Sequence, residues 1–173
     1  MRASSKAWRA LTVLGMAVAA MAPFTAAQAT QAVDIRQGGE FQIRTFADKC
    51  FDVRGGGSAD DTPIIQYRCT GRFNQRFRIL PVGDGEFEIR TFADKCFDVR
   101  GGGSADDTPI IQYRCTGGAN QRFRILPVGV GEFEIRTFAD KCFDVRGGSS
   151  ADDTPIIQYR CTGGANQRFR IVT

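Results

Sequence analysis

The sequence predicts an all-β protein with the β-trefoil fold, in which three near-identical lobes surround a pseudo-threefold axis. Three observations lead to this prediction. Cysteines recur in two series whose members are 46 positions apart: Cys50, Cys96, Cys142 and Cys69, Cys115, Cys161. Apolar residues alternate with polar ones in short runs separated by turn residues, as is typical of strands. No run of ten residues after position 38 shows helical periodicity.

The repeats define the domain organisation. Residues 85–127 and 131–173 differ at only three positions, and residues 39–84 differ from 85–130 at only four. We therefore expect lobes at 39–84, 85–130 and 131–173, which together form one domain because a single unit of this size cannot bury its apolar face alone. A β-propeller blade also has four strands in a similar length, but propellers use four to eight blades. Three units favour the trefoil.

Each unit is predicted to contain four short strands. In the second unit these are the runs 85–92, 96–100, 108–115 and 120–125, which are rich in Phe, Ile, Val and Tyr. The segments between them, 93–95, 101–107, 116–118 and 127–129, carry Gly, Asp, Thr or Pro and are predicted turns.

The N-terminal segment resembles a secretory signal. A basic stretch through Arg9 precedes an apolar run from Leu11 to Phe24, and Ala27-Gln28-Ala29 fits signal peptidase. We expect a signal peptide at 1–29, a linker at 30–38 and a secreted, extracellular mature chain. The alternative is a transmembrane anchor, but the apolar run is short and contains Pro23, so no membrane insertion is expected.

Charge and composition exclude several functions. The net charge is +4, but three of the 23 Lys and Arg lie in the first ten residues, so 20 face 19 Asp and Glu in the rest of the chain. This near neutrality argues against nucleic-acid binding, which needs a cationic face. The absence of histidine removes Ser-His-Asp and Cys-His sites and His-bound zinc. We expect no enzyme activity, no cofactor and no metal.

The cysteines are expected to form one disulfide in each lobe. Six cysteines allow 15 pairings, but only pairing within a unit repeats the same geometry three times. The expected bridges are Cys50–Cys69, Cys96–Cys115 and Cys142–Cys161. A metal site is the alternative, although CxxC spacing is missing.

The unit CFDVRGGGSADDTPIIQYRCTGGANQRFRI resembles the ricin B-type lectin repeat, over about residues 39–173. The shared features are a Cys-x-Asp-Val strand, a Gly-rich loop, a Thr-Pro strand with an aromatic residue two before the second Cys, and an Asn-Gln-x-aromatic signature. This chain departs from the family in three ways: Phe replaces the signature Trp, Asp replaces Gly before Thr-Pro, and Ile replaces a frequent Gln. The substituted positions are Phe77, Phe123, Phe169; Asp61, Asp107, Asp153; and Ile65, Ile111, Ile157.

The resemblance implies a sugar site in each lobe. A carboxylate accepts hydrogen bonds from vicinal hydroxyls, an amide donates and accepts, and an aromatic ring meets the C–H face of a pyranose. The expected carbohydrate-binding residues are Asp52, Tyr67, Asn74, Gln75 in lobe 1, Asp98, Tyr113, Asn120, Gln121 in lobe 2, and Asp144, Tyr159, Asn166, Gln167 in lobe 3. The Gln residues are expected to brace the site rather than contact sugar. For each residue a purely structural role in turns or core is the alternative.

We therefore expect a non-enzymatic lectin with up to three equivalent shallow sites for glycans or polysaccharides, of galactose or xylose type. The alternative from another class is a trefoil protease inhibitor or protein-interaction module, which would present one distinctive loop. A third interpretation is a carbohydrate-binding module that serves a separate secreted enzyme chain.

Overall fold

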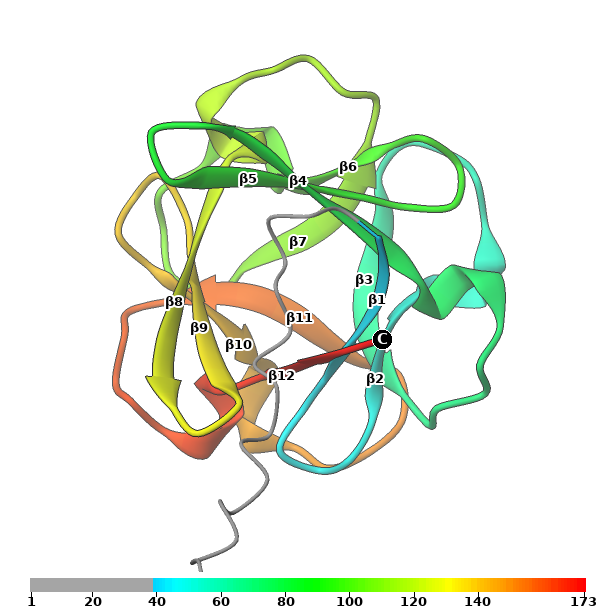
Figure 1. The fold of residues 1–173 in the computed structure, drawn as a ribbon, viewed down its shortest axis with the longest axis vertical. Coiled ribbons are helices and arrows are strands. Elements are labelled where there is room, and N and C mark those ends of the chain that lie inside the picture. Colours follow the sequence, from blue (N-terminus) through cyan, green and yellow to red (C-terminus); the bar gives the residue numbers. More distant parts are fainter. Residues whose placement is uncertain (1–38) are drawn as a thin grey trace, which may run out of the picture.

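The computed structural model describes residues 39–173, which form a β-trefoil of twelve strands joined in one hydrogen-bonded sheet (Figure 1). The predicted all-β class and threefold arrangement are confirmed. The expected signal peptide and linker lie outside the described residues. Within residues 39–173, no helix is long and apolar enough to cross a membrane.

Each lobe contributes four strands in the same order. Lobe 1 (39–84) contains β1 (Glu40–Arg44), β2 (Cys50–Val53), β3 (Thr62–Tyr67) and β4 (Phe77–Gly83). Lobe 2 (85–130) contains β5 (Glu86–Arg90), β6 (Cys96–Val99), β7 (Thr108–Tyr113) and β8 (Phe123–Gly129). Lobe 3 (131–173) contains β9 (Glu132–Arg136), β10 (Cys142–Val145), β11 (Thr154–Tyr159) and β12 (Arg170–Val172).

Short 3₁₀ turns follow the second and third strand of every lobe. The first kind is η2 (Arg54–Gly56), η4 (Arg100–Gly102) and η6 (Arg146–Gly148). The second kind is η3 (Phe73–Gln75), η5 (Ala119–Gln121) and η7 (Ala165–Gln167). The first turn needs glycine because its second residue has a positive φ, 65° at Gly55.

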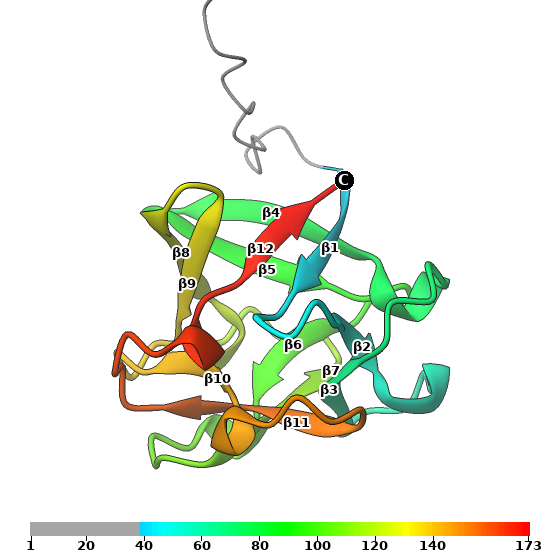
Figure 2. The same cartoon turned by 90° about the horizontal axis from the view of Figure 1, so that it is seen from below.

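The strands form a barrel closed at one end by three hairpins. In the barrel, β1 pairs with β4 and β12, β5 pairs with β4 and β8, and β8 pairs with β9. A bridge between Phe133 and Phe169 joins β9 to the segment before β12 and closes the ring. In the cap, β3, β7 and β11 pair with one another around the axis, and each also pairs with its hairpin partner β2, β6 or β10 (Figure 2).

Phenylalanine rings fill the core at the axis. Phe51, Phe97 and Phe143 lie with their centroids 6.4 Å apart in each pair. The three residues that replace the signature Trp are nearly fully buried and each meets one of these rings edge-on at 5.0 Å: Phe77, Phe123 and Phe169. The Phe that replaces the signature Trp therefore occupies a core position in each lobe.

The fourth strand differs from the prediction. Asn120 and Gln121 lie in the turn η5 rather than in a strand, and Pro127–Gly129, expected as a turn, belongs to β8. The strand tolerates Pro127 because the register with β9 shifts between Pro127 and Gly129, and such a bulge accommodates a residue without a backbone N–H. The chain reverses after Gly129 instead.

All three expected disulfides are present. The bridges Cys50–Cys69, Cys96–Cys115 and Cys142–Cys161 join each second strand to the segment after the third. None of these cysteines is free, so the metal alternative is wrong for them.

The lobes are tied to one another by polar contacts that repeat around the axis. The buried side chain of Gln112 donates from Nε2 to the carbonyl oxygens of Gly57 and Ala59, at 2.8 and 2.9 Å. Gln66 and Gln158 make the same contacts with the loops of lobes 3 and 2. Each Gly-rich loop is therefore held by the neighbouring lobe.

Candidate functional site

The hairpin of β2 and β3 in lobe 1 places two predicted site residues, Asp52 and Tyr67, on the same face as Ile65. Asp52 in β2 is paired in register with Ile65 in β3, and Tyr67 lies two residues further along β3. Side chains at this spacing share a face of the sheet. All three line a groove of about 810 Å³, whose other walls come from the turns η2 and η3, the segment between β3 and η3, and Asp153 of lobe 3.

Asn74 also lines this groove, whereas Gln75 does not. Gln75 is fully buried, and its Nε2 donates to Oδ2 of Asp52 at 2.8 Å and to the carbonyl oxygen of Arg68 at 2.9 Å. Its Oε1 accepts from the backbone N–H of Thr70 at 2.7 Å. The bonding capacity of Gln75 is thus used inside the protein, where it fixes one oxygen of Asp52.

Lobes 2 and 3 repeat this arrangement with one change. Gln121 and Gln167 donate to Asp98 and Asp144 at 2.7 and 2.8 Å. In these lobes the asparagine amide also donates to the same oxygen, at 2.9 Å from Asn120 to Asp98 and 2.8 Å from Asn166 to Asp144. In lobe 1, Nδ2 of Asn74 donates to the carbonyl oxygen of Val53 at 3.2 Å.

Burial dominates the electrostatics of the three aspartates. It raises the pKa of Asp52, Asp98 and Asp144 above the ordinary value of 3.8, and the amide of the neighbouring Gln offsets part of that rise. Each carboxylate has a fixed Oδ2 and an Oδ1 for which no protein donor is found within residues 39–173. A buried acceptor at the base of a groove can receive hydroxyl groups.

The tyrosines are half-buried, and each carries an arginine over its ring. The guanidinium carbon of Arg68 lies 5.3 Å from the ring centroid of Tyr67, and Arg114 and Arg160 occupy the same position over Tyr113 and Tyr159. A sugar that stacks on the ring would use the opposite face or displace this exposed guanidinium.

The aspartates that replace glycine before Thr-Pro have a left-handed backbone. Asp61, Asp107 and Asp153 have φ of 67°, 67° and 64°. Their carboxylates have a role that local sequence does not reveal, because each pairs with an arginine of a neighbouring lobe: Arg100–Asp61 and Arg146–Asp107 at 2.8 Å, and Arg54–Asp153 at 2.9 Å. The Arg54–Asp153 pair borders the lobe 1 groove.

The preceding aspartates bind cations of the protein itself. Asp60 contacts Nζ of Lys95 at 2.5 Å and Nε of Arg114 at 2.9 Å, and Asp106 and Asp152 contact Lys141 and Lys49 in the same way. These Asp-Asp pairs therefore hold adjacent lobes together. Their only sequence signal was their threefold repetition.

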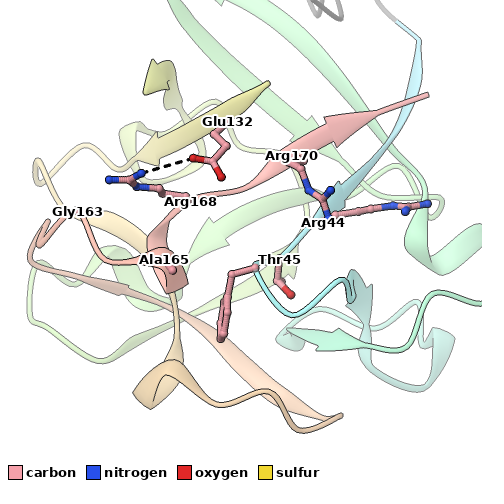
Figure 3. Close-up of a pocket in the computed structure, with 8 residues that line it drawn as sticks. Arg44, Thr45, Glu132, Gly163, Ala165, Arg168 and Arg170 are labelled. Carbon is pink, nitrogen blue, oxygen red and sulfur yellow. Dashed lines mark ion pairs between the residues drawn. The ribbon is translucent and has the colours of Figure 1, made fainter. Parts of the chain in front are cut away.

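A second hollow lies where lobes 1 and 3 meet (Figure 3). It measures about 330 Å³ and is lined by Arg44, Thr45, Phe46, Glu132, Gly163, Ala165, Arg168 and Arg170. The Glu132–Arg168 ion pair, at 3.6 Å, crosses one side of it. In the equivalent place between lobes 1 and 2, where Phe73 corresponds to Ala165, the hollow is only about 70 Å³.

The fold and the Asp-Tyr-Asn set repeated in each lobe agree with the comparison with protein families. The ricin-type β-trefoil lectin domain matches residues 38–130, and a related ricin-type β-trefoil lectin domain matches residues 119–173. The chain belongs to the ricin-type β-trefoil lectin domain family, which is a carbohydrate-binding fold.

Two solved structures show the same architecture. The designed threefold-symmetric protein ThreeFoil is 31% identical, with a TM-score of 0.76, over 78% of this chain and 98% of that protein. The exo-β-1,3-galactanase of Clostridium thermocellum is 28% identical, with a TM-score of 0.75, over 77% of this chain and 30% of the enzyme.

Among curated proteins, the probable lipoprotein EnvE of Salmonella typhimurium is 52% identical over 33 residues. The match spans 19% of this chain and 19% of that lipoprotein. It therefore covers less than one lobe.

Proposed function

We propose that this chain is a secreted, non-enzymatic lectin that binds glycans through three sites, one in each lobe. The observation that carries the proposal is the buried aspartate of each lobe, held through Oδ2 by a fully buried glutamine, which in lobe 1 lies in a groove. An ionised carboxylate that is fixed on one oxygen presents the other to a ligand at little further cost in ordering.

The surrounding side chains suit a neutral pyranose. In lobe 1, Asp52 would accept from two vicinal hydroxyls, Asn74 would donate or accept at a third, and Tyr67 would meet the C–H face. Ile65, the partner of Asp52 on the neighbouring strand, adds an apolar side chain to the wall of the groove. The groove thus combines the few polar groups and the apolar wall that sugar recognition requires.

We further propose that the preferred sugars are of galactose or xylose type. The exo-β-1,3-galactanase of Clostridium thermocellum supports the galactose assignment, since a region of that enzyme is 28% identical to this chain. Secretion is supported by the three disulfides, which persist in oxidising compartments, and by the signal-like N-terminal sequence.

Multivalent binding would supply the useful affinity. A shallow site for one pyranose is worth about −4 kcal/mol, a dissociation constant near 1 mM. Three such sites on one rigid body can bind one polysaccharide together, which raises the avidity by roughly 10²-fold without new contacts.

The direct test compares polymer and monosaccharide. The oxidised protein should be retained on beads that carry β-1,3-galactan or xylan, and calorimetric titration with galactose or xylose should show only millimolar affinity. Binding to neither polymer and to neither monosaccharide would contradict the proposed function. Equal affinity for polymer and monosaccharide would contradict its multivalent mechanism.

A further inference from the structure

Lobe 1 differs from the other two lobes at the rim of its groove. Arg72 and Phe73 stand where lobe 2 has Gly118 and Ala119 and lobe 3 has the same Gly-Ala pair. Phe73 is 58% exposed, and both Arg72 and Phe73 line the groove that contains Asp52. The two residues are half of the four differences between the first and second units, so they are the main chemical difference between these two sites.

The Phe73 ring is held in place by the neighbouring lobe. Its centroid lies 4.6 Å from that of Phe92, with the ring planes at 67°. Phe73 fills the junction that Ala165 leaves open at the equivalent place (Figure 3), reducing the hollow from about 330 to about 70 Å³. One side of the ring is therefore anchored while the rest remains exposed at the groove, and a fixed platform costs little ordering on binding.

Arg72 changes the site in a second way, through Asn74. A Cβ atom at Gly118 would lie 2.7 Å from Oδ1 of Asn120, and a Cβ at Gly164 would lie equally close to Oδ1 of its asparagine. Such a contact is too short, so the Cβ of Arg72 excludes this asparagine position in lobe 1. Accordingly, Asn74 donates to the backbone, while Asn120 donates to Asp98.

This difference affects the aspartate. Oδ2 of Asp98 accepts from Gln121 at 2.7 Å and from Asn120 at 2.9 Å. Asn74 donates to the carbonyl oxygen of Val53 at 3.2 Å and makes a weaker contact with Asp52, which still lowers the pKa of that carboxyl. The carboxylate of Asp52 is therefore held less closely by its asparagine than that of Asp98.

We propose that lobe 1 is an extended site that binds two consecutive sugar units. The first unit lies against Asp52 and Tyr67, and the second lies against the exposed face of Phe73, with the N–H groups of Arg72 available to its hydroxyls. Lobes 2 and 3, which have Gly-Ala at these positions, bind one unit each. This inference rests on the proposed lectin function and makes the three sites unequal.

The test isolates single lobes. One variant, Asp98→Asn/Asp144→Asn, keeps only the lobe 1 site, and another, Asp52→Asn/Asp144→Asn, keeps only the lobe 2 site. The probes are galactose and β-1,3-galactobiose, with xylose and xylobiose as a second pair, titrated by NMR. We expect the lobe 1 variant to bind a disaccharide about tenfold more tightly than its monosaccharide, the effect of one aromatic contact. The lobe 2 variant should show less than about a twofold difference.

Two further variants test whether the disaccharide preference comes from the residues at the rim of the groove. Phe73→Ala in the lobe 1 variant should remove the disaccharide preference, and Gly118→Arg/Ala119→Phe in the lobe 2 variant should create it. Thermal unfolding of each variant controls for folding. The grafted pair would sit beside Phe138, which corresponds to Phe92 in an otherwise matching repeat.

The outcomes separate the two proposals. Equal disaccharide preference in both single-lobe variants, or an unchanged preference after Phe73→Ala, would overturn the extended site while leaving the lectin function intact. Failure of the unaltered protein to bind any of the four probes and both polymers would overturn the lectin function itself.

Discussion

Nε2 of Gln121 donates to Oδ2 of Asp98 over 2.7 Å, and both side chains are buried. Gln121 also donates to the carbonyl oxygen of Arg114 and accepts from the backbone of Thr116, so it joins the strand that carries the aspartate to the segment after the disulfide. The signature glutamine thus connects the fold of the lobe with the orientation of its carboxylate.

Replacing Gln121 by Met should therefore affect both stability and binding. The change keeps the side-chain volume but leaves the Arg114 carbonyl and the Thr116 N–H without their partner and the buried Asp98 carboxylate with Asn120 alone, which we expect to cost about 2–3 kcal/mol of unfolding free energy. Urea denaturation measures this cost. Val130→Asp, which introduces the lobe 1 residue at a 92% exposed position, is the matched control and should stay within about 0.5 kcal/mol of the unaltered protein.

Acidification should abolish glycan binding before it unfolds the protein. Burial raises the pKa values of Asp52, Asp98 and Asp144, so these carboxylates gain a proton at a pH above 3.8. A protonated carboxyl group accepts fewer hydrogen bonds from the hydroxyls of a sugar, so glycan binding weakens at that pH. Hydrogen bonds from lysine lower the pKa values of Asp60, Asp106 and Asp152, so the stabilisation that these inter-lobe pairs provide is present above 3.8 and is lost only as the pH falls further, through their lowered values.

Bead retention and near-ultraviolet circular dichroism measured across the same pH series check this order. Binding that persists to the pH of unfolding would show that the three buried carboxylates are not the ligand groups.

The sequence predicts the trefoil, the lobes and the disulfides because all three follow from a repeat that is nearly exact in spacing. It misplaces the fourth strand, since Pro127 and Gly129 are turn formers by composition and their place in β8 depends on a bulge opposite β9. Such a bulge is set by pairing between strands, which local patterns do not reveal.

Part of the candidate site is predictable because its residues recur at fixed positions in the repeat. Asp52, Tyr67 and Asn74 come together because they occupy fixed positions in one hairpin and one turn. The inequality of lobe 1 is harder to predict, because it arises from the distance between a Cβ atom and an asparagine oxygen and from the packing of Phe73 on a residue of the next lobe.

Because the backbone at Asp107 is left-handed, the glycine variant at this position should be more stable than the alanine variant, the reverse of the usual order. Both Asp107→Ala and Asp107→Gly remove the ion pair with Arg146, but alanine keeps a Cβ at φ of 67°. We expect the glycine variant to be more stable by about 1 kcal/mol, the cost of this conformation for a residue with a Cβ. Thermal unfolding of the two variants decides, and a more stable alanine variant would contradict the assigned strain.

Removing one disulfide should destabilise each lobe to a similar extent. Cys96→Ala/Cys115→Ala opens a loop closed by residues 19 apart, for which the chain-entropy model gives about 3 kcal/mol. Denaturation of the three pairwise variants measures the effect. Peptide mapping that joins cysteines of different lobes would contradict the local closure.

The central claim is that the three buried aspartates bind the glycan, and the triple variant Asp52→Asn/Asp98→Asn/Asp144→Asn tests it most directly. Asparagine keeps the shape and an oxygen for the bracing glutamine, and it removes a buried charge, so the melting temperature should stay close to that of the unaltered protein. Retention on β-1,3-galactan or xylan beads should fall to the level of uncoated beads. Retention equal to that of the unaltered protein, with the fold intact, would contradict the account.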